Sequence, residues 1–416
     1  MNHSRRSFVV VATYSLAGLR SAWASRGETS ITEEGVDYYD KLGVETIVNA
    51  AGTYTDFTGA IMPRSVQLAV AKAAQRPVRL QALQLAAGTY LAKRLQCEAA
   101  LVSAGASSAL TLGAAACITV ANQKAEDIPG HLPQAMDGLK NEVIMQKGHR
   151  YSYDHALQCA GARIVEVETF NEYRAAFNPN TVLAHFYNAA TSGTIGREEW
   201  ITVAHQHNVP CMNDAAADMP PIANLWNYTK MGFDLVVFSG GKGIRGPQNA
   251  GLLLGKSNLI TAAAQNNNSN DNVVGRGQKV AKEQIVGMVA AVDWLLSQSD
   301  QAMENEFRGR AQTIAARLKD IPSLQAQIFV PEVANHVPTL LLRYDQKRVN
   351  ITPLKVAEIL RTGSPSIELH PATGNPEPGI PSDVNTVVVG VWMLQPGQAL
   401  LVARRLHETL LGAVNV

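Results

Sequence analysis

Short apolar runs alternate with longer, helix-like stretches through the middle of the chain. The runs predict buried strands at residues 99–102, 143–145, 164–167, 181–186, 209–212, 235–238 and 251–254. Several of these runs are apolar throughout, as expected of strands that are buried on both faces of a parallel sheet. Strands separated by helices in this way favour an α/β fold with a mainly parallel sheet.

Helical periodicity surrounds this region on both sides. A short helix is predicted at 36–42, and longer helices are predicted at 63–76 and 80–96, before the first strand. Two more, at 282–297 and 301–320, follow the last strand. Beyond them the pattern changes again, with strands at 327–330, 339–342, 367–370 and 386–391 and helices at 354–361 and 398–411. This last region predicts a small C-terminal α/β domain.

The domain boundaries follow from these patterns. We assign residues 25–277 to an N-terminal segment with a large domain, and residues 278–416 to the connecting helices with the small domain. The boundary lies in the asparagine-rich stretch 265–277, which predicts a mobile polar loop. Arg276 and Lys279 at its end are either a contribution to a neighbouring subunit's site or solvated charges at a helix start.

Lys242 lies in the glycine-rich sequence FSGGKGIRGPQNA at 238–250, directly after a buried strand. Open α/β sheets bind ligands at the carboxyl ends of their strands, and glycines let the backbone approach a planar cofactor closely. A desolvated lysine keeps its amine unprotonated often enough to attack a carbonyl, so Lys242 is predicted to form a Schiff base. A phosphate-binding P-loop is the alternative, but it requires Ser or Thr where Gly243 stands.

Asp214 ends another predicted strand and is followed by three alanines. An enzyme that uses pyridoxal phosphate needs a carboxylate beside the pyridinium nitrogen, and small neighbours leave room for the ring. Capping of the next helix is the alternative role for an aspartate at a strand end. The presence of Lys242 after the following strand favours the cofactor role.

A candidate phosphate site lies where the strand at 99–102 gives way to an alanine-rich helix. Gly105 and Ala106 expose backbone amides there, Ser107 can cap the helix, and the helix N-terminus attracts an anion. Ser239, near Lys242, offers a further hydroxyl. An ordinary serine N-cap is the alternative for this segment.

Six segments occur in the order seen in one family: NAAGT at 49–53, SAGASSAL at 103–110, QKGHR at 146–150, NDAAA at 213–217, SGGKG at 239–243 and GRGQKVAKE at 275–283. From about residue 37 onward the chain resembles the selenocysteine-synthase-like branch of fold-type-I pyridoxal phosphate enzymes. This branch includes L-seryl-tRNA(Sec) selenium transferase and D-glucosaminate-6-phosphate ammonia-lyase, and the resemblance is closer to the ammonia-lyase.

The resemblance implies a fold, a cofactor and a set of roles. The fold is that of type I, with a mainly parallel seven-stranded-type sheet, and the cofactor is pyridoxal 5'-phosphate. Lys242 would carry the cofactor, Asp214 would pair with its ring nitrogen, and His149 would lie over the ring, although a solvated loop histidine is the alternative. The phosphate would be held by Gly105, Ala106, Ser107 and Ser239. A homodimer or a higher homo-oligomer is implied as well.

The N-terminus carries its own signal. Arg5 and Arg6 precede an apolar stretch at 8–19, and the small-x-small pattern at 22–24 resembles a signal-peptidase site. We therefore predict a twin-arginine signal peptide at 1–24, recognition by the twin-arginine export machinery, and a periplasmic product. This route carries folded proteins, which suits a protein loaded with a cytosolic cofactor. Because Arg20 lies in the region just before the expected cleavage site, an uncleaved signal that anchors the protein is the alternative.

Composition limits the kinds of partner that the protein is expected to bind. The 416 residues carry a net charge of +1, which argues against a nucleic-acid partner and hence against the tRNA-dependent activity. Because the protein would fold in the reducing cytosol, we predict that its four cysteines are buried free thiols.

These residues predict a small-molecule substrate and α,β-elimination of a β-hydroxy amino acid or amino sugar acid, giving a 2-oxo acid and ammonia. Racemisation and transamination use the same residues and stay open, as do, with less support, selenium transfer and a non-enzymatic cofactor-binding role. The turn at 188–194 faces either the cofactor or substrate, or is a generic loop. The candidates for the substrate carboxylate are Arg343, His336 and His370.

Overall fold

The computed structural model describes residues 35–124, 127–377 and 379–415, so the predicted signal at 1–24 lies outside the described residues. The chain divides into two compact units, Met1–Thr46 and Ile47–Val416. The described part of the first unit holds one short helix, α2 (Tyr38–Leu42). Asp37 caps this helix by accepting a hydrogen bond from the amide of Tyr39, and Gly43 ends it with a left-handed φ of 67°.

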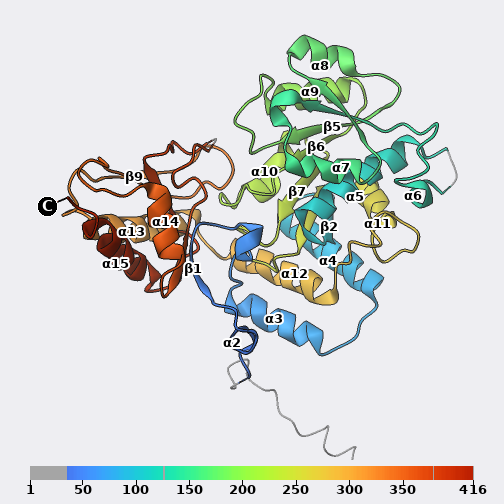
Figure 1. Cartoon of the computed structure of the whole chain (residues 1–416). Coiled ribbons are helices and arrows are strands. Elements are labelled where there is room, and N and C mark those ends of the chain that lie inside the picture. The colour runs from blue at the N-terminus through green and yellow to red at the C-terminus, as the bar shows by residue number, and fades with distance from the viewer. Residues whose placement is uncertain (1–34, 125–126, 378, 416) are drawn as a thin grey trace, which may run out of the picture. The chain divides into compact units, whose positions relative to one another are not determined.

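The second unit is built on a seven-stranded sheet with the order β2-β8-β7-β6-β5-β3-β4 (Figure 1). Its strands are β2 (Ala99–Ser103), β3 (Glu142–Gln146), β4 (Arg163–Val167), β5 (Thr181–Tyr187), β6 (Cys211–Asp214), β7 (Leu235–Ser239) and β8 (Gly251–Gly255). Only β8 runs against its neighbours β2 and β7; the other pairs are parallel. The predicted α/β class and mainly parallel sheet are therefore confirmed.

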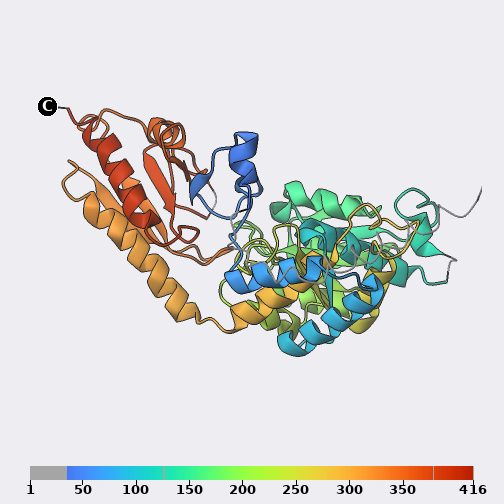
Figure 2. The ribbon, with the colours of Figure 1, turned by 90° about the horizontal axis from the view of Figure 1, so that it is seen from below.

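The strands are buried on both faces because their side chains alternate between two cores. In β7, Val236 and Phe238 pack into one core with α12 (Lys282–Leu296), whereas Leu235 and Val237 pack into the other with α5 (Gly105–Ala121). Helix α3 (Arg64–Ala74) lies beside α12 (Figure 2). The remaining helices of this part are α4 (Leu80–Leu95), α6 (Ile128–His131), α7 (His155–Gln158), α8 (Phe170–Ala176), α9 (Arg197–Gln206), α10 (Asn224–Met231) and α11 (Ser257–Gln265).

The C-terminal part has a smaller, antiparallel sheet of order β12-β10-β9. It comprises β9 (Gln325–Phe329), β10 (Thr339–Arg343) and β12 (Thr386–Gly390), covered by α13 (Asp300–Arg317), α14 (Pro353–Arg361) and α15 (Gln398–Leu411). Helices α13 and α15 lie side by side (Figure 2). The predicted strands and helices of this region are present, and the boundary that we placed after residue 277 stays a prediction.

One pairing joins distant parts of the sequence. Strand β1 (Ile47–Ala50) pairs in parallel with β11 (Ser366–Leu369), with Ile47 opposite Ser366. We expected a strand at 367–370 but no strand at 47–50. The pair brings the segment that follows β1 beside the segment that follows β11.

The asparagine-rich stretch differs from our expectation of a solvated, mobile loop. Asn266, Asn267 and Asn268 are buried. The Asn266 amide donates to Thr119 Oγ1 at 3.0 Å and to the carbonyl of Ala262 at 2.9 Å. Asparagine side chains satisfy neighbouring backbone groups by hydrogen bonding, so residues 266–268 are packed into the fold, whereas Asp271, Asn272 and Arg276 later in the stretch are exposed.

The four cysteines are free thiols, as predicted, but their burial varies. Cys117 and Cys211 are buried, Cys97 is partly buried, and Cys159 is exposed, so the prediction of burial was wrong for Cys159. In the described ranges, we find no helix with both the length and the apolar character needed to cross a membrane.

Candidate active site

Lys242 is held in a tight loop between β7 and β8. The amide of Gly246 donates to the carbonyl of Gly240 at 2.7 Å, and that of Gly240 donates to Ala250 at 2.8 Å. A Cβ on Gly241 would lie 2.5 Å from the Cα of Gln248, so this glycine is required by close packing. We expected the glycines to supply the turn, yet the left-handed residue here is Arg245, with φ of 56°. The loop thus fixes the backbone from which Lys242 projects.

Lys242 and Asp214 lie close enough for the charge of each to affect the pKa of the other. Burial lowers the pKa of Lys242, while the nearby Asp214 and Asp218 oppose that shift. Burial raises the pKa of Asp214, against the hydrogen bonds from the hydroxyl of Tyr151 and, at 3.0 Å, from the amide of Ala216. This shift in the pKa of Lys242 favours the unprotonated amine that a nucleophile requires.

The candidate phosphate site lies at the N-terminus of α5. Gly105 begins the helix with φ of 88°, and no side chain caps the helix at Ala104. A Cβ at Gly251 of the neighbouring β8 would collide with the backbone of Gly105, so only glycine allows the strand to lie this close. The uncapped amides of the first turn remain available to an anion.

These groups line one cavity of about 460 Å³, which we call the cofactor-side cavity. Lys242 and Asp214 line it together with four residues of the predicted phosphate site, Gly105, Ala106, Ser107 and Ser239. Tyr151, Tyr153 and Tyr187 add aromatic walls. Six of the seven residues that we predicted for the site therefore share one cavity.

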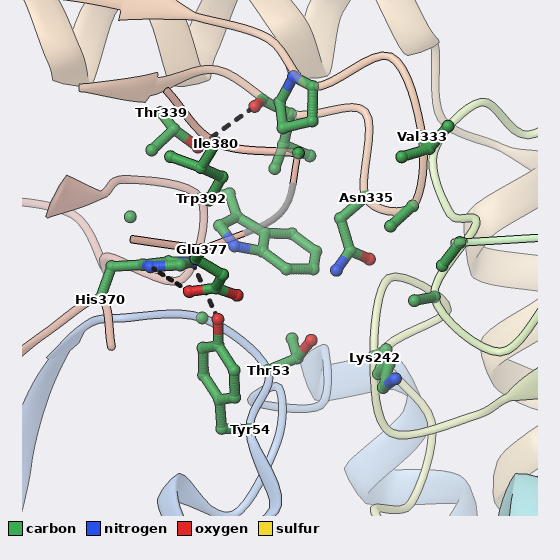
Figure 3. A pocket seen from close by; sticks show the side chains of 18 of the residues that line it. Thr53, Tyr54, Lys242, Val333, Asn335, Thr339, His370, Glu377, Ile380 and Trp392 are labelled. Atoms are coloured by element: carbon green, nitrogen blue, oxygen red, sulfur yellow. Dashed lines mark hydrogen bonds and ion pairs between the residues drawn. The ribbon is translucent and has the colours of Figure 1, made fainter. Parts of the chain in front are cut away.

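A second cavity of about 280 Å³ meets the first at Lys242, Tyr187 and Ala217. We call it the substrate-side cavity, and Figure 3 shows its lining, with Lys242 on one side and His370 and Glu377 on the other. Its walls come from the segments after β1, β5, β9, β11 and β12. Lys242 is therefore accessible from both cavities.

His370 is a fixed, neutral group in the substrate-side cavity. Its Nδ1 accepts from the amide of Ala372 at 3.1 Å, which leaves the ring proton on Nε2, 2.8 Å from the hydroxyl of Tyr54. Burial lowers the pKa of His370 to about 4 and raises that of Tyr54. Glu377 lies close by, with its Oε2 3.7 Å from His370 Nδ1, and burial raises its pKa too.

Comparison with known proteins agrees with this geometry. The model of the class-V aminotransferase family matches residues 155–341. Over 341 residues the chain is 25% identical to the D-glucosaminate-6-phosphate ammonia lyase of Salmonella typhimurium, covering 79% of this chain and 88% of that protein. A solved structure of D-glucosaminate-6-phosphate ammonia-lyase superposes with a TM-score of 0.76 at 23% identity, covering 91% of this chain and all of the other.

The chain is a fold-type-I, pyridoxal-phosphate-dependent enzyme. It is also 28% identical over 391 residues to a protein of a Streptomyces species named 5'-C-glycyluridine monooxygenase-decarboxylase, covering 90% of this chain and 92% of that protein. A selenium transferase, L-seryl-tRNA(Sec) selenium transferase of Mannheimia succiniciproducens, is 28% identical over 254 residues, which is 53% of this chain and 51% of that one.

The cofactor of the enzyme is pyridoxal 5'-phosphate, and the residues of the cofactor-side cavity fit it. The uncapped amides of α5 and the hydroxyls of Ser107 and Ser239 suit the phosphate. Lys242 suits the aldehyde, and the carboxylate of Asp214 suits the ring nitrogen. The individual roles stay predictions.

His149 is the predicted residue that the structure does not bring to the cavity. It is buried behind the wall, where Nδ1 accepts from the amide of Tyr187 at 3.2 Å and the ring packs edge-on against Phe186. Tyr151, two residues later, lines the cavity in its place, bonded to Asp214 and stacked on Tyr187 with ring centroids 3.9 Å apart. Only the proximity of Tyr151 to the QKGHR segment hinted at this.

The three residues predicted as candidates to bind the substrate carboxylate also differ in where they lie. Of the three, only His370 lines the substrate-side cavity. Arg343 donates to Thr386 Oγ1 at 3.0 Å, and His336 Nδ1 bonds the carbonyl of Pro331 at 2.9 Å, so both serve the small domain. Sequence reasoning missed Tyr54, Glu377 and Asn335, because no local motif marks them.

The turn after β5 contributes to both the site and its support. Ala189 and Thr191 line the substrate-side cavity. Asn188 instead is buried and donates to Asp218 and to the hydroxyl of Tyr228, while it accepts from Arg197 Nε at 2.5 Å. Burial and the neighbouring Asp214 raise the pKa of Asp218 to about 7. This network holds a second carboxyl close to the Asp214–Lys242 pair.

Proposed function

We propose that the enzyme is an ammonia-lyase that performs α,β-elimination on a β-hydroxy amino acid or an amino sugar acid. The observation that carries the proposal is Lys242, an amine with a lowered pKa that lines both the cofactor-side and the substrate-side cavity. The similarity to a protein named D-glucosaminate-6-phosphate ammonia lyase supports the reaction class.

When bound, the cofactor withdraws electrons from the substrate's Cα and so acidifies its proton. Asp214 places a negative charge where the ring nitrogen is expected, which favours a protonated ring. Lys242 accepts the Cα proton on Nζ, because an amine held beside the reacting carbon gains from proximity. Loss of the β-hydroxyl as water, followed by hydrolysis of the resulting enamine, gives a 2-oxo acid and ammonia.

Product analysis tests the proposal. Purified enzyme loaded with pyridoxal phosphate is incubated with D-glucosaminate, its 6-phosphate, and both enantiomers of serine and threonine. We expect ammonia and a 2-oxo acid in equal amounts, without an added acceptor. Inversion at Cα would make the enzyme a racemase, and dependence on a 2-oxo acid would make it an aminotransferase. Bound cofactor with no turnover of any amine would make it a carrier.

Oxidative decarboxylation is a second candidate, favoured by the 28% identity to the Streptomyces protein over 90% of this chain. The name of that protein describes a monooxygenase-decarboxylase, so this activity would consume oxygen and release carbon dioxide from an amino acid. An oxygen electrode separates the two candidates, because elimination consumes no oxygen.

We also propose that the enzyme is exported to the periplasm by the twin-arginine machinery, and the twin arginines with the small-x-small pattern support this. Full-length protein carrying Arg5→Lys and Arg6→Lys should remain in the cytoplasm upon cell fractionation, whereas the unchanged protein should reach the periplasm. Equal distribution of the two would exclude the proposed route.

A homodimer is our proposal for the assembly. Helices α3 and α4 expose apolar side chains, with Leu68 44% and Leu85 74% accessible, and such surfaces mark interfaces. Light scattering on the purified enzyme gives the mass directly, and a monomer at micromolar concentration would contradict the proposal.

A further inference from the structure

The far end of the substrate-side cavity, across from Lys242, holds polar groups that the reaction does not use (Figure 3). Its groups are the carboxylate of Glu377, the hydroxyl of Tyr54 and the ring of His370, and the amide of Asn335 lines the same cavity. We propose that this end binds the hydroxyl groups of an uncharged polyol tail, so that the preferred substrate is an amino sugar acid without a phosphate. This inference rests on the proposed function of the site.

Charge is the first argument. Among the described residues that line the cavity, Lys242 is the single lysine or arginine and Glu377 the single acid. His370 adds no positive charge near neutral pH, because burial lowers its pKa to about 4. Proteins bind phosphate through Arg, Lys or a helix N-terminus, and none of these faces this end. A phosphate dianion placed there would be repelled by Glu377.

Hydrogen bonding is the second argument. The Oδ1 atom of Asn335 is buried without a hydrogen-bond partner in the described part of the chain. Glu377 Oε2 approaches His370 only to 3.7 Å, which is too long for a hydrogen bond. Both residues line the cavity, and an unsatisfied buried acceptor costs free energy until a donor arrives. Hydroxyl groups donate, whereas a fully ionised phosphate only accepts.

The fixed orientation of the donors adds selectivity. Because His370 Nε2–H points to the Tyr54 oxygen, the Tyr54 hydroxyl proton is free to donate into the cavity. The raised pKa of Tyr54 keeps that proton in place near neutral pH. One donor beside two acceptors matches a row of hydroxyl groups, each of which both donates and accepts.

Binding of amine-free analogues tests the inference without any turnover. Calorimetry on the cofactor-loaded enzyme compares D-gluconate with D-gluconate 6-phosphate. We expect the phosphate to bind at least about tenfold more weakly, since a like charge disfavours the wrong ligand. Glu377→Gln should reduce that difference to less than about threefold by removing the repulsion. Glu332→Gln, an exposed glutamate of the same region that does not line the cavity, should leave the ratio unchanged.

The outcomes separate this inference from the proposed function. Equal or tighter binding of the phosphate, or no binding of either analogue, would overturn the inference, even if the enzyme releases ammonia from another amine. An unchanged ratio in Glu377→Gln would remove Glu377 from the argument and overturn the inference as well. Selective gluconate binding with no ammonia release from any substrate would support the inference and refute the lyase proposal.

Discussion

The cofactor-side and the substrate-side cavities share Lys242 but are assembled in different ways. The cofactor-side cavity is lined mainly by the large domain, where consecutive strand ends and the start of α5 bring Asp214, Lys242 and Gly105 together. The substrate-side cavity takes its walls from segments as far apart as Thr53 and Trp392. The residues of the cofactor-side cavity therefore lie in local sequence motifs, whereas the residues of the substrate-side cavity are brought together by long-range strand pairing.

The largest expected effect comes from the residue that both cavities share. Lys242→Ala should lower kcat by about 10³–10⁴-fold, because it removes both the nucleophile and the base. The absorbance band of the lysine-bound cofactor should disappear, and borohydride should no longer attach the cofactor to the protein. Lys319→Ala, an exposed lysine, is the matched control. Retention of the band would rule out Lys242 as the attachment site.

A substitution that alters only the cofactor-side cavity should lower kcat slightly less than the loss of Lys242. Asp214→Asn should lower kcat by about 10²–10³-fold, since the ring nitrogen loses its charged partner. The affinity for pyridoxal phosphate, measured by fluorescence titration, should fall as well, while the binding of gluconate should not. An unaltered kcat would show that another group protonates the ring.

Asp218 lies behind the cofactor-side cavity, and its shifted pKa makes the free energy of unfolding depend on pH. Its pKa is about 7 in the folded protein and about 3.8 in a free aspartate, so the folded state holds its proton more tightly. The free energy of unfolding therefore falls as pH rises from 4 to 7, by about 1.4 kcal/mol per pH unit at most. Asp218→Asn should remove this contribution and gain about 2–3 kcal/mol relative to the unchanged enzyme between pH 5 and 7.

Guanidinium unfolding of the apoenzyme at a series of pH values measures this difference. Asp345→Asn, which alters an exposed carboxyl of the small domain, should leave the pH profile in place. Parallel profiles of the unchanged enzyme and Asp218→Asn would show that Asp218 is ionised in the fold.

The smallest effect should come from the substrate-side cavity. Tyr54→Phe removes one hydroxyl and should lower kcat/KM by about fivefold, mostly through KM, because a single neutral hydrogen bond is worth about 1 kcal/mol. The cofactor absorbance should stay unchanged. Tyr39→Phe, in the exposed helix α2, provides the control. A change in the cofactor spectrum would place Tyr54 in the other cavity.

The difference between the two cavities also explains which site residues could be predicted from the sequence. Lys242, Asp214 and Gly105 were predictable because each ends or follows a recognisable strand, and strand ends meet at one edge of a sheet. Tyr54 and Glu377 were not, because their positions depend on the pairing of β1 with β11, which no periodicity reveals. The QKGHR motif located the right segment, but the sequence did not show which side chain there lines the cavity. Tyr151 does so, whereas His149 is buried behind the wall.

Burial was also misjudged where composition was the only guide. The asparagines at 266–268 looked like a solvated loop, yet they are buried, and the amide of Asn266 donates to a backbone and a side-chain group inside the fold. Cys159 looked like a core thiol, yet it follows the short helix α7 at the surface.

The pairing of β1 with β11 has a consequence for the order of biosynthesis. The ribosome makes β1 before the whole large sheet and β11 after it. A nascent chain that has just completed β8 already holds every segment of the cofactor-side cavity, while β1 still waits for its partner. The substrate-side cavity is thus closed only after the large sheet has been translated.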